Sequence, residues 1–294
     1  MKVFVTGGTG FIGSAVVREL LEAGHEVIGL VRSEKSRQQL TAMGASAVDG
    51  SLEDLDSLQR GAESADAVIH LAFIHNFVDF AASAETDKRA IEAIGEALVG
   101  TNKTFIVTSG VPSGADGHVV TENDPSDPRT PRMSEQTALP FAKRGVRVLI
   151  VRPSRFVHGD GVYGFITWLM DIAREKGAAA YIGDGANRIH AVHRLDLSRL
   201  FLLVLEKGET SAKYQAVSDC AVPYRDIAEA IGRRLNVPVI SLSTEQGLAH
   251  FGFLCQIVGA DNPASSEITQ AALGWNPTHL SLLEDLEASC GDVS

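Results

Sequence analysis

The sequence is poor in cysteine, carries no basic tract and contains no long apolar run. Its three cysteines, Cys220, Cys255 and Cys290, lie far apart and form no metal-ligand pattern, which argues against disulfides and metal sites. The net charge of −11 argues against nucleic-acid or anionic-membrane partners. No apolar run approaches the roughly 18 residues that a membrane span needs. Because residues 2–5 read as a core strand rather than a signal peptide, we expect a cytoplasmic protein.

The chain does contain a strand, a glycine turn and a helix at its beginning. Residues 6–13 read Thr-Gly-Gly-Thr-Gly-Phe-Ile-Gly, after an apolar run and before a helical composition. In a dinucleotide-binding fold Gly7 permits the tight turn, Gly10 lets the backbone approach a pyrophosphate, and Gly13 allows close packing of helix on strand. The helix N-terminus adds N–H groups and partial positive charge. The stretch predicts a phosphate-binding site; a glycine turn without a ligand is the alternative.

A basic residue follows the second predicted strand, about twenty residues beyond the glycine turn. This position faces the adenosine ribose in dinucleotide folds, where an acidic residue accepts hydrogen bonds from the 2′-hydroxyl and an arginine pairs with a 2′-phosphate. Arg32, with Lys35 and Arg37 nearby, therefore favours NADP over NAD. The alternative is a solvated basic cluster on the next helix.

Strands and helices alternate through the first half of the chain. Strands are predicted at residues 2–5, 26–31, 45–49, 66–72, 103–110 and 146–152, with helices between them. This alternation predicts an α/β fold with a doubly wound parallel sheet over residues 1–152. The alternation of strands and helices stops after residue 152. Residues 153–294 are therefore predicted to form a smaller lobe of mixed structure, although later segments can return to the sheet. Ligands of such sheets bind at the carboxyl edge of the strands.

These motifs together resemble the extended and atypical short-chain dehydrogenase/reductase families over essentially the whole chain. Thr-Gly-x-x-Gly-x-x-Gly at residues 6–13 is the extended-type fingerprint. The resemblance implies a Rossmann domain, a nicotinamide cofactor and a C-terminal substrate lobe. Further like motifs are His70-Leu71-Ala72, Thr108-Ser109, Arg152-Pro153, His158-Gly159 and Gly274-Trp275-Asn276-Pro277. The implied cofactor residues are Gly7, Thr9, Gly10, Phe11, Ile12, Gly13, Arg32, Ser51, Leu52, Leu71, Ala72, Phe73 and Pro153.

The chain departs from these families at their catalytic pair. The family uses Tyr-x-x-x-Lys, usually with a serine just before the lysine. When Ser134 is aligned with that serine, Pro131 takes the position of the tyrosine and Glu135 that of the lysine. Pro131 has no side-chain proton to give, and an anionic Glu135 would not stabilise a phenolate.

Three residues are candidates for the chemistry that remains. Ser109 keeps the family's serine position and can donate a hydrogen bond to a substrate oxygen, or it can bond the backbone at the strand end. Tyr163 can replace the missing tyrosine, although an aromatic wall of the pocket is favoured. Arg132 can orient or polarise a substrate carbonyl or carboxylate, or it can lie at the surface.

The second half contributes further polar candidates. His158 can carry protons near neutral pH, or it can hydrogen-bond locally in a glycine turn. A polar cluster comprises Asn187, Arg188, His190 and His193. It can bind substrate, or it can be a hydrogen-bonded hinge in which His193 and Asp196, an N-cap candidate, hold the following helix.

The sequence favours an NADP(H)-dependent oxidoreductase that reduces a small carbonyl compound or oxidises an alcohol. A non-catalytic NADP-binding regulator, resembling the NmrA-like proteins, also explains an intact cofactor loop without the catalytic pair. A sugar-nucleotide epimerase fits less well, because family epimerases depend on the Tyr-Lys pair. We expect a small-molecule substrate and, from the resemblance, a homodimer.

Overall fold

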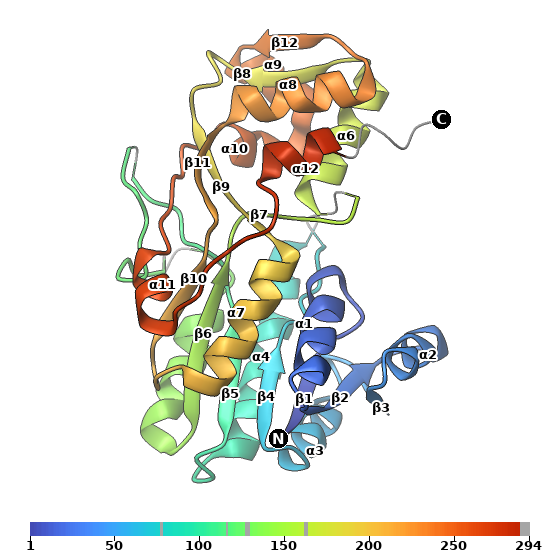
Figure 1. Cartoon of the computed structure of the whole chain (residues 1–294), viewed down its shortest axis with the longest axis vertical. Coiled ribbons are helices and arrows are strands. Elements are labelled where there is room, and N and C mark those ends of the chain that lie inside the picture. Colours follow the sequence, from blue (N-terminus) through green and yellow to red (C-terminus); the bar gives the residue numbers. More distant parts are fainter. Residues whose placement is uncertain (77–78, 116, 127–129, 162–163, 289–294) are drawn as a thin grey trace.

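A seven-stranded parallel sheet forms the base of the molecule in the computed structural model, which describes residues 1–76, 79–115, 117–126, 130–161 and 164–288. Its strands lie in the order β10-β6-β5-β4-β1-β2-β3 (Figure 1). Their bounds are β1 (Lys2–Thr6), β2 (Glu26–Val31), β3 (Ser46–Asp49), β4 (Ala67–His70), β5 (Thr104–Thr108), β6 (Arg147–Pro153) and β10 (Lys213–Ala216). The order of strands reverses beside β1, which confirms the predicted doubly wound sheet.

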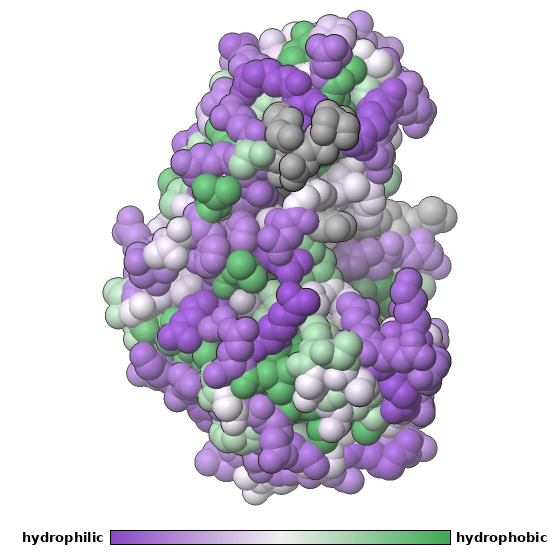
Figure 2. Space-filling model, turned by 45° about the vertical axis from the view of Figure 1, so that its right-hand side comes forward, coloured by the Kyte–Doolittle hydropathy of each residue, from purple (hydrophilic) through white to green (hydrophobic). Residues whose placement is uncertain are grey.

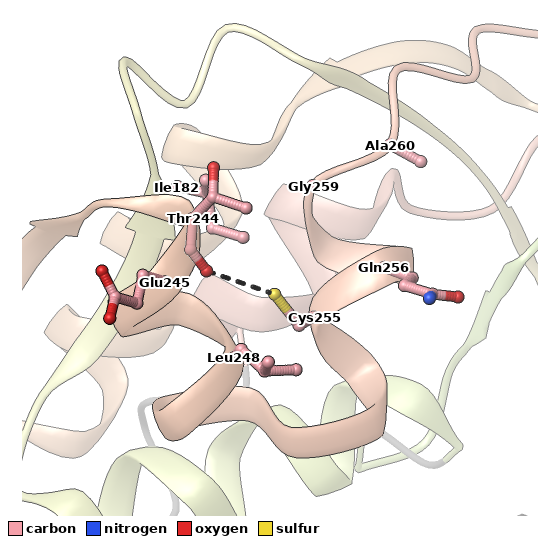
Figure 3. A pocket seen from close by; sticks show the side chains of 8 residues that line it. All are labelled: Ile182, Thr244, Glu245, Leu248, Cys255, Gln256, Gly259 and Ala260. Carbon is pink, nitrogen blue, oxygen red and sulfur yellow. Dashed lines mark hydrogen bonds between the residues drawn. The ribbon is translucent and has the colours of Figure 1, made fainter.

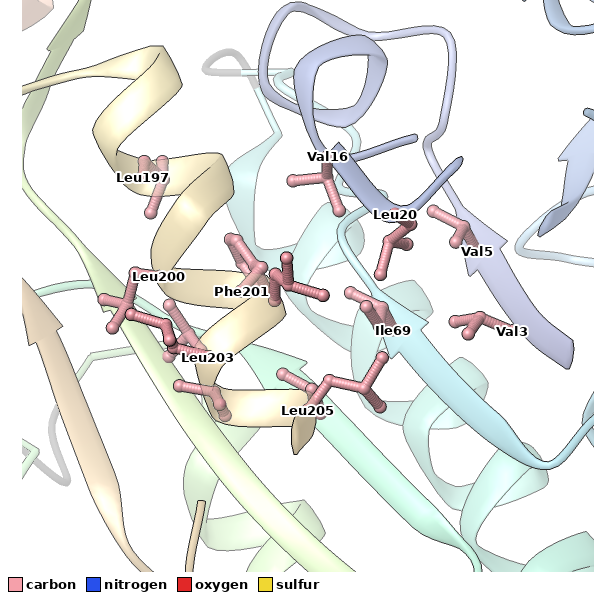
Figure 4. Close-up of a cluster of buried hydrophobic side chains, with 14 of the residues drawn as sticks. Val3, Val5, Val16, Leu20, Ile69, Leu197, Leu200, Phe201, Leu203 and Leu205 are labelled. Atoms are coloured by element: carbon pink, nitrogen blue, oxygen red, sulfur yellow. The ribbon is translucent and has the colours of Figure 1, made fainter. Parts of the chain in front are cut away.

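Helices cover both faces of this sheet, because alternate strand residues point to opposite faces. One face carries α1 (Phe11–Glu22) and α7 (Arg194–Lys207), whose side chains meet those of β1 and β4 in one core cluster (Figure 4). The other face carries α3 (Leu55–Glu63), α4 (Phe80–Leu98), α5 (Ser134–Ala138) and the 3₁₀ helix η1 (Leu139–Arg144). A short helix, α2 (Glu34–Ala42), joins β2 to β3.

A smaller mixed lobe lies above the carboxyl edge of the sheet (Figure 1), as the sequence predicts. Its sheets are formed by β7 (Phe156–His158), β9 (Arg188–His193) and β11 (Asp219–Pro223), and by β8 (Ala179–Ile182) and β12 (Val239–Leu242). Its helices are α6 (Phe165–Lys176), α8 (Tyr224–Leu235), α9 (Thr244–Phe251), η2 (Gly252–Leu254), α10 (Cys255–Val258) and α12 (Leu282–Ala288). Two segments of the C-terminal half, α7 and β10, belong instead to the large sheet and its covering layer.

The segment that follows α11 (Glu267–Leu273) is hydrogen-bonded to the first turn of α7. Asp196 accepts hydrogen bonds from the backbone N–H groups of Thr278 and His279, and its backbone carbonyl accepts from the Trp275 indole at 2.9 Å. The prediction that Asp196 caps α7 is wrong. The N-cap is His193, whose Nδ1 accepts from Leu195 N, and Asp196 lies within the first turn.

Hydrophilic residues cover most of the face seen in Figure 2, where hydrophobic residues gather only in small groups. Within the described ranges, no helix has both the length and the apolar character that crossing a membrane requires.

Candidate functional site

The glycine turn joins β1 to α1 at the carboxyl edge of the sheet. Gly7 has φ of +73°, a conformation that side chains disfavour, and its carbonyl accepts from Gly10 N at 3.0 Å. A Cβ on Gly13 would lie 2.0 Å from that carbonyl oxygen, so the turn and the helix pack too closely for any side chain. A Cβ on Gly10 would have a single close neighbour among the described residues, Gly7 O at 3.2 Å. The space in front of Gly10 is therefore the open side of the turn.

The start of α1 has no side-chain cap. Its N-cap is Gly10, which has no side chain to cap the helix, and the intrahelical bonds begin at Ser14 N, which donates to Gly10 O. Other residues of the turn contact the rest of the chain. Thr9 O accepts from Gln39, the ring of Phe11 lies 5.0 Å from the Arg194 guanidinium, and Ile12 packs against the core.

The end of β4 lies beside this turn. Leu71 N donates to Thr6 O at 3.3 Å, and Ala72 N donates to Thr6 Oγ1 at 3.2 Å. A Cβ on Gly7 would lie 2.8 Å from Ala72 N. The backbone of Leu71 and Ala72 therefore forms a second wall of the predicted cofactor site, and Phe73 continues it.

At the predicted binding site for the adenosine part of the cofactor, some side chains are exposed and others already bind neighbouring residues. Arg32 is exposed directly after β2, and its guanidinium makes no hydrogen bond or ion pair with residues that the structure describes. Arg37 is engaged, because it pairs with Asp49 at 2.6 Å. Ser51 Oγ accepts from two backbone N–H groups of the next turn, and Leu52 is buried in the core.

Glu135 is the centre of a buried polar cluster. Its two carboxylate oxygens accept from Arg152 Nε at 2.7 Å and Nη2 at 2.8 Å. Ser109 Oγ donates to one of these oxygens and Ser126 Oγ to the other, each at 2.6 Å. We call Ser109, Ser126, Glu135 and Arg152 the Glu135 cluster. It joins the end of β5, the loop before α5, α5 itself and β6.

The electrostatics of this cluster favour the ionised carboxylate. Burial raises the pKa of Glu135, but the hydrogen bonds and charge of Arg152, together with the two serine hydroxyls, outweigh burial and hold that pKa below its usual value. Because the single proton of Ser109 is donated to Glu135, the Ser109 oxygen is left with lone pairs that can accept a hydrogen bond. Ser109 is only partly buried, so a ligand can reach that oxygen.

A second polar chain connects the glycine turn to α5. Thr6 Oγ1 contacts His70 Nδ1 at 2.9 Å, and His70 Nε2 lies 3.2 Å from Asp87 Oδ1. Ser134 Oγ donates to Asp87 Oδ2 at 2.6 Å. Burial raises the pKa of Asp87, but its hydrogen bonds and the positive charge of Arg132 outweigh burial and lower it.

Arg132 is held at the site rather than free at the surface. Its guanidinium donates to Thr108 O at 2.9 Å and to Ser134 Oγ at 3.1 Å, and its centre lies 4.2 Å from the centroid of the Phe73 ring.

Another residue predicted from the sequence to take part in catalysis, Tyr163, lies outside the described residues. Pro153 is buried at the end of β6.

Other polar residues of the lobe that were candidates for substrate binding or proton transfer instead form hydrogen bonds between segments of the lobe. His158 is fully buried and its Nδ1 lies 3.0 Å from Asp285 on α12. Asn187 donates to the carbonyl of Val258, the last residue of α10, and to that of Ala260, and Arg188 pairs with Asp261 at 2.7 Å. These bonds favour the hinge interpretation over a substrate-binding cluster.

The sequence gives no sign of a hollow of about 720 Å³ in the lobe, which lies away from the glycine turn (Figures 1 and 3). Thr244 and Leu248 of α9 line it together with Cys255 of α10 (Figure 3). The Cys255 thiol donates to Thr244 O at 4.0 Å. Within the described ranges, no cluster of three or more His, Cys, Asp or Glu side chains could hold a metal ion.

The sequence profile of the NAD dependent epimerase/dehydratase family matches residues 3–218. An uncharacterized protein of Schizosaccharomyces pombe is 48% identical over 97% of this chain and 98% of its own length. A sterol-4-alpha-carboxylate 3-dehydrogenase of Dictyostelium discoideum is 27% identical over 76% of this chain and 73% of its own. A similar solved structure is the dTDP-glucose 4,6-dehydratase of Streptomyces venezuelae with NAD bound, with a TM-score of 0.79, 22% identity and coverage of 99% and 96% of the two chains.

Removal of the Arg152 guanidinium should strongly destabilise the fold. An Arg152→Leu substitution leaves Glu135 buried without its cation, and breaking one half of a buried pair costs about 3–5 kcal/mol. Urea unfolding at neutral pH measures this loss. Adding Glu135→Gln to Arg152→Leu should recover part of it, because the uncompensated charge is then removed. A double variant as unstable as Arg152→Leu would contradict the ion-pair account.

The exposed bidentate pair Arg144–Glu96 provides the matched control. Arg144→Leu should change the free energy of unfolding little, because solvent screens that pair.

The contribution of Glu135 to stability should depend on pH in a definite direction. The folded pKa of Glu135 is lowered, so its stabilisation is present above its ordinary value of 4.5 and is lost as pH falls through the folded pKa. The deficit of Arg152→Leu should therefore shrink in acid.

Proposed function

The chain belongs to the NAD dependent epimerase/dehydratase family, and from this premise we propose an NADP(H)-dependent oxidoreductase that reduces a small carbonyl compound or oxidises the corresponding alcohol. The observation that carries the proposal is the glycine turn, which has no room for a side chain at Gly13 and opens in front of Gly10. A turn of this shape at a helix N-terminus suits a pyrophosphate. The dehydrogenase and reductase names among its relatives support the same class of reaction.

Each part of the cofactor would meet a different set of residues. The pyrophosphate would bind the N–H groups at the start of α1, and the backbone of Leu71 and Ala72 would line its other side. Arg32 would pair with the 2′-phosphate, because it is exposed and engages no described carboxylate. Arg37 would contribute little, since Asp49 already neutralises it.

The Glu135 cluster offers a route for the substrate proton without the family's tyrosine. A bound nicotinamide supplies or accepts the hydride. In the oxidation direction, the substrate hydroxyl would donate to Ser109 Oγ while Ser109 passes its own proton to Glu135. In the reduction direction, the same protons would move back through Ser109 to the substrate oxygen after Glu135 had taken up a proton from solvent, a step that its lowered pKa makes faster in acid. Arg152 is a positioning residue, because it holds the carboxylate that orients Ser109.

A second function, NADP-dependent regulation without turnover, is favoured by one observation. The family's tyrosine and lysine positions hold Pro131 and Glu135. A protein that only sensed NADP would need the cofactor contacts and would make no use of Ser109.

Because the space in front of Gly10 is open, a substitution there should weaken cofactor binding without destabilising the fold. Gly10→Ala should fold normally yet bind NADPH at least tenfold more weakly, because its methyl group would enter the pyrophosphate site. Fluorescence titration measures the affinity, and thermal unfolding measures the fold. The matched variant Gly13→Ala should instead unfold at lower temperature, because its Cβ would clash with Gly7 O. Unchanged NADPH affinity in Gly10→Ala would remove the cradle assignment.

Arg32 should decide between the two nicotinamide cofactors. Arg32→Ala should weaken NADPH binding by roughly 10- to 100-fold, the value of a charge-assisted hydrogen bond, and should leave NADH binding nearly unchanged. Calorimetric titration of both cofactors measures the difference. Lys35→Ala, a neighbouring exposed cation, serves as the control and should have a smaller effect. Equal losses for the two cofactors would exclude a 2′-phosphate contact.

Ser109 should be required for turnover. Ser109→Ala should lower kcat on any carbonyl substrate by roughly 100- to 10,000-fold, the usual contribution of a positioned proton carrier, and should leave NADPH affinity unchanged. Ser126→Ala removes the other serine hydrogen bond to Glu135 and should retain most activity. If Ser109→Ala turns over as fast as the original protein, the proton route is wrong.

A further inference from the structure

Arg155 is a charged residue that forms no ion pair within the part of the chain that the structure describes. It lies two residues beyond the end of β6, between the large sheet and the lobe, and is partly buried. Its Nη2 donates to Ser113 Oγ at 3.2 Å, and no carboxylate among the described residues forms an ion pair with it. Burial lowers the pKa of Arg155, and no described carboxylate opposes that effect.

Other arginines at the ends of β6 and β9 do have carboxylate partners. Arg152 binds Glu135, Arg188 binds Asp261 at 2.7 Å and Arg194 binds Asp160 at 3.1 Å. Arg155 is partly buried, so it loses some of its hydration, and no described carboxylate compensates for that loss; an anionic ligand would. Arg155 is therefore suited to meet an anion that comes from outside the chain.

The backbone places Arg155 near the proposed reaction site. Ser109 N donates to Val151 O and Val111 N donates to Pro153 O, so the segment after β5 runs alongside the end of β6. Ser113 and Arg155 continue these two segments and meet beyond Ser109 and Arg152. Three residues of extended chain span roughly 10 Å, so Arg155 lies further along the same edge than the Glu135 cluster.

Of the two basic side chains that meet here, only Arg155 carries a charge near pH 7. His190 is beside Arg155, and its Nδ1 accepts from Arg155 N at 3.2 Å. Burial and the positive charge of Arg155 lower the pKa of His190 to about 3, so its ring is neutral near pH 7. One guanidinium and one hydroxyl match a carboxylate, which carries one charge and accepts two parallel bonds. A phosphate monoester carries nearly two charges and would be left undercompensated.

We propose that Arg155, assisted by Ser113, binds a carboxylate of the substrate, several bonds away from the carbon that is reduced or oxidised. The substrate class is then an oxo acid or hydroxy acid whose acid group is not adjacent to the reacting carbon. This inference rests on the proposed oxidoreductase function for the reaction, but the anion contact itself does not depend on turnover.

The test uses para-substituted benzaldehydes that differ at one group: 4-carboxybenzaldehyde, its methyl ester and 4-formylphenyl phosphate. Binding of each compound to the NADP-loaded protein is measured by calorimetry, and turnover is measured by NADPH oxidation. The original protein should bind the carboxylate about 10- to 100-fold more tightly than the ester, the value of a charge-assisted hydrogen bond. Arg155→Gln should remove this preference and leave binding of the ester unchanged. Arg144→Gln, an arginine paired far from the edge, should retain it.

The outcomes separate this inference from the proposed function. If the carboxylate preference persists in Arg155→Gln, or if the original protein has no preference, the Arg155 assignment is overturned. Tighter binding of the phosphate than the carboxylate would overturn the choice of substrate class. Arg155-dependent carboxylate binding without NADPH oxidation would support the anion site and count against the oxidoreductase.

Discussion

The ion pair between Glu135 and Arg152 is the interaction on which the rest of the site depends. It places a carboxylate in the interior of the protein without leaving a buried net charge. Both oxygens of Glu135 are filled by two guanidinium N–H groups and two serine hydroxyls, which is the full satisfaction that a buried ion pair requires. The direction of the Ser109 proton, and so the chemistry available to Ser109, follows from this arrangement.

A second constraint ties the cofactor turn to the same helix. The chain from Thr6 through His70 and Asp87 to Ser134 starts at the end of β1 and finishes at the first residue of α5. Ser134 and Glu135 are adjacent, so the two polar chains meet at the start of α5. A shift of the glycine turn would therefore disturb the residues proposed to handle the proton. Arg155 forms no hydrogen bond or ion pair with either group of residues, which leaves it available for the proposed contact with a substrate carboxylate.

The sequence predicted those features that depend on local pattern. The glycine turn and the β-α alternation follow from the local sequence pattern alone. The partners of Glu135 could not be predicted in the same way. Arg152 on β6 is 17 residues away from it in the sequence, and Ser109 at the end of β5 is 26 residues away. His158 and Asp196 were assigned from local sequence, whereas their partners come from α12 and from the segment after α11. The sequence departure at Glu135 was visible, but its compensation by Arg152 required the fold.

We propose that this chain transfers a hydride with NADP(H) at the sheet edge where Ser109 meets Glu135. The most direct measurement follows the label from NADPH deuterated at the nicotinamide carbon that gives up hydride. Mass spectrometry of the alcohol formed from a panel of aldehydes, ketones and oxo acids should find one deuterium in the product, and far less product in Ser109→Ala. Tight NADPH binding with no deuterium in any product would contradict the account and identify the chain as a cofactor-binding protein without turnover.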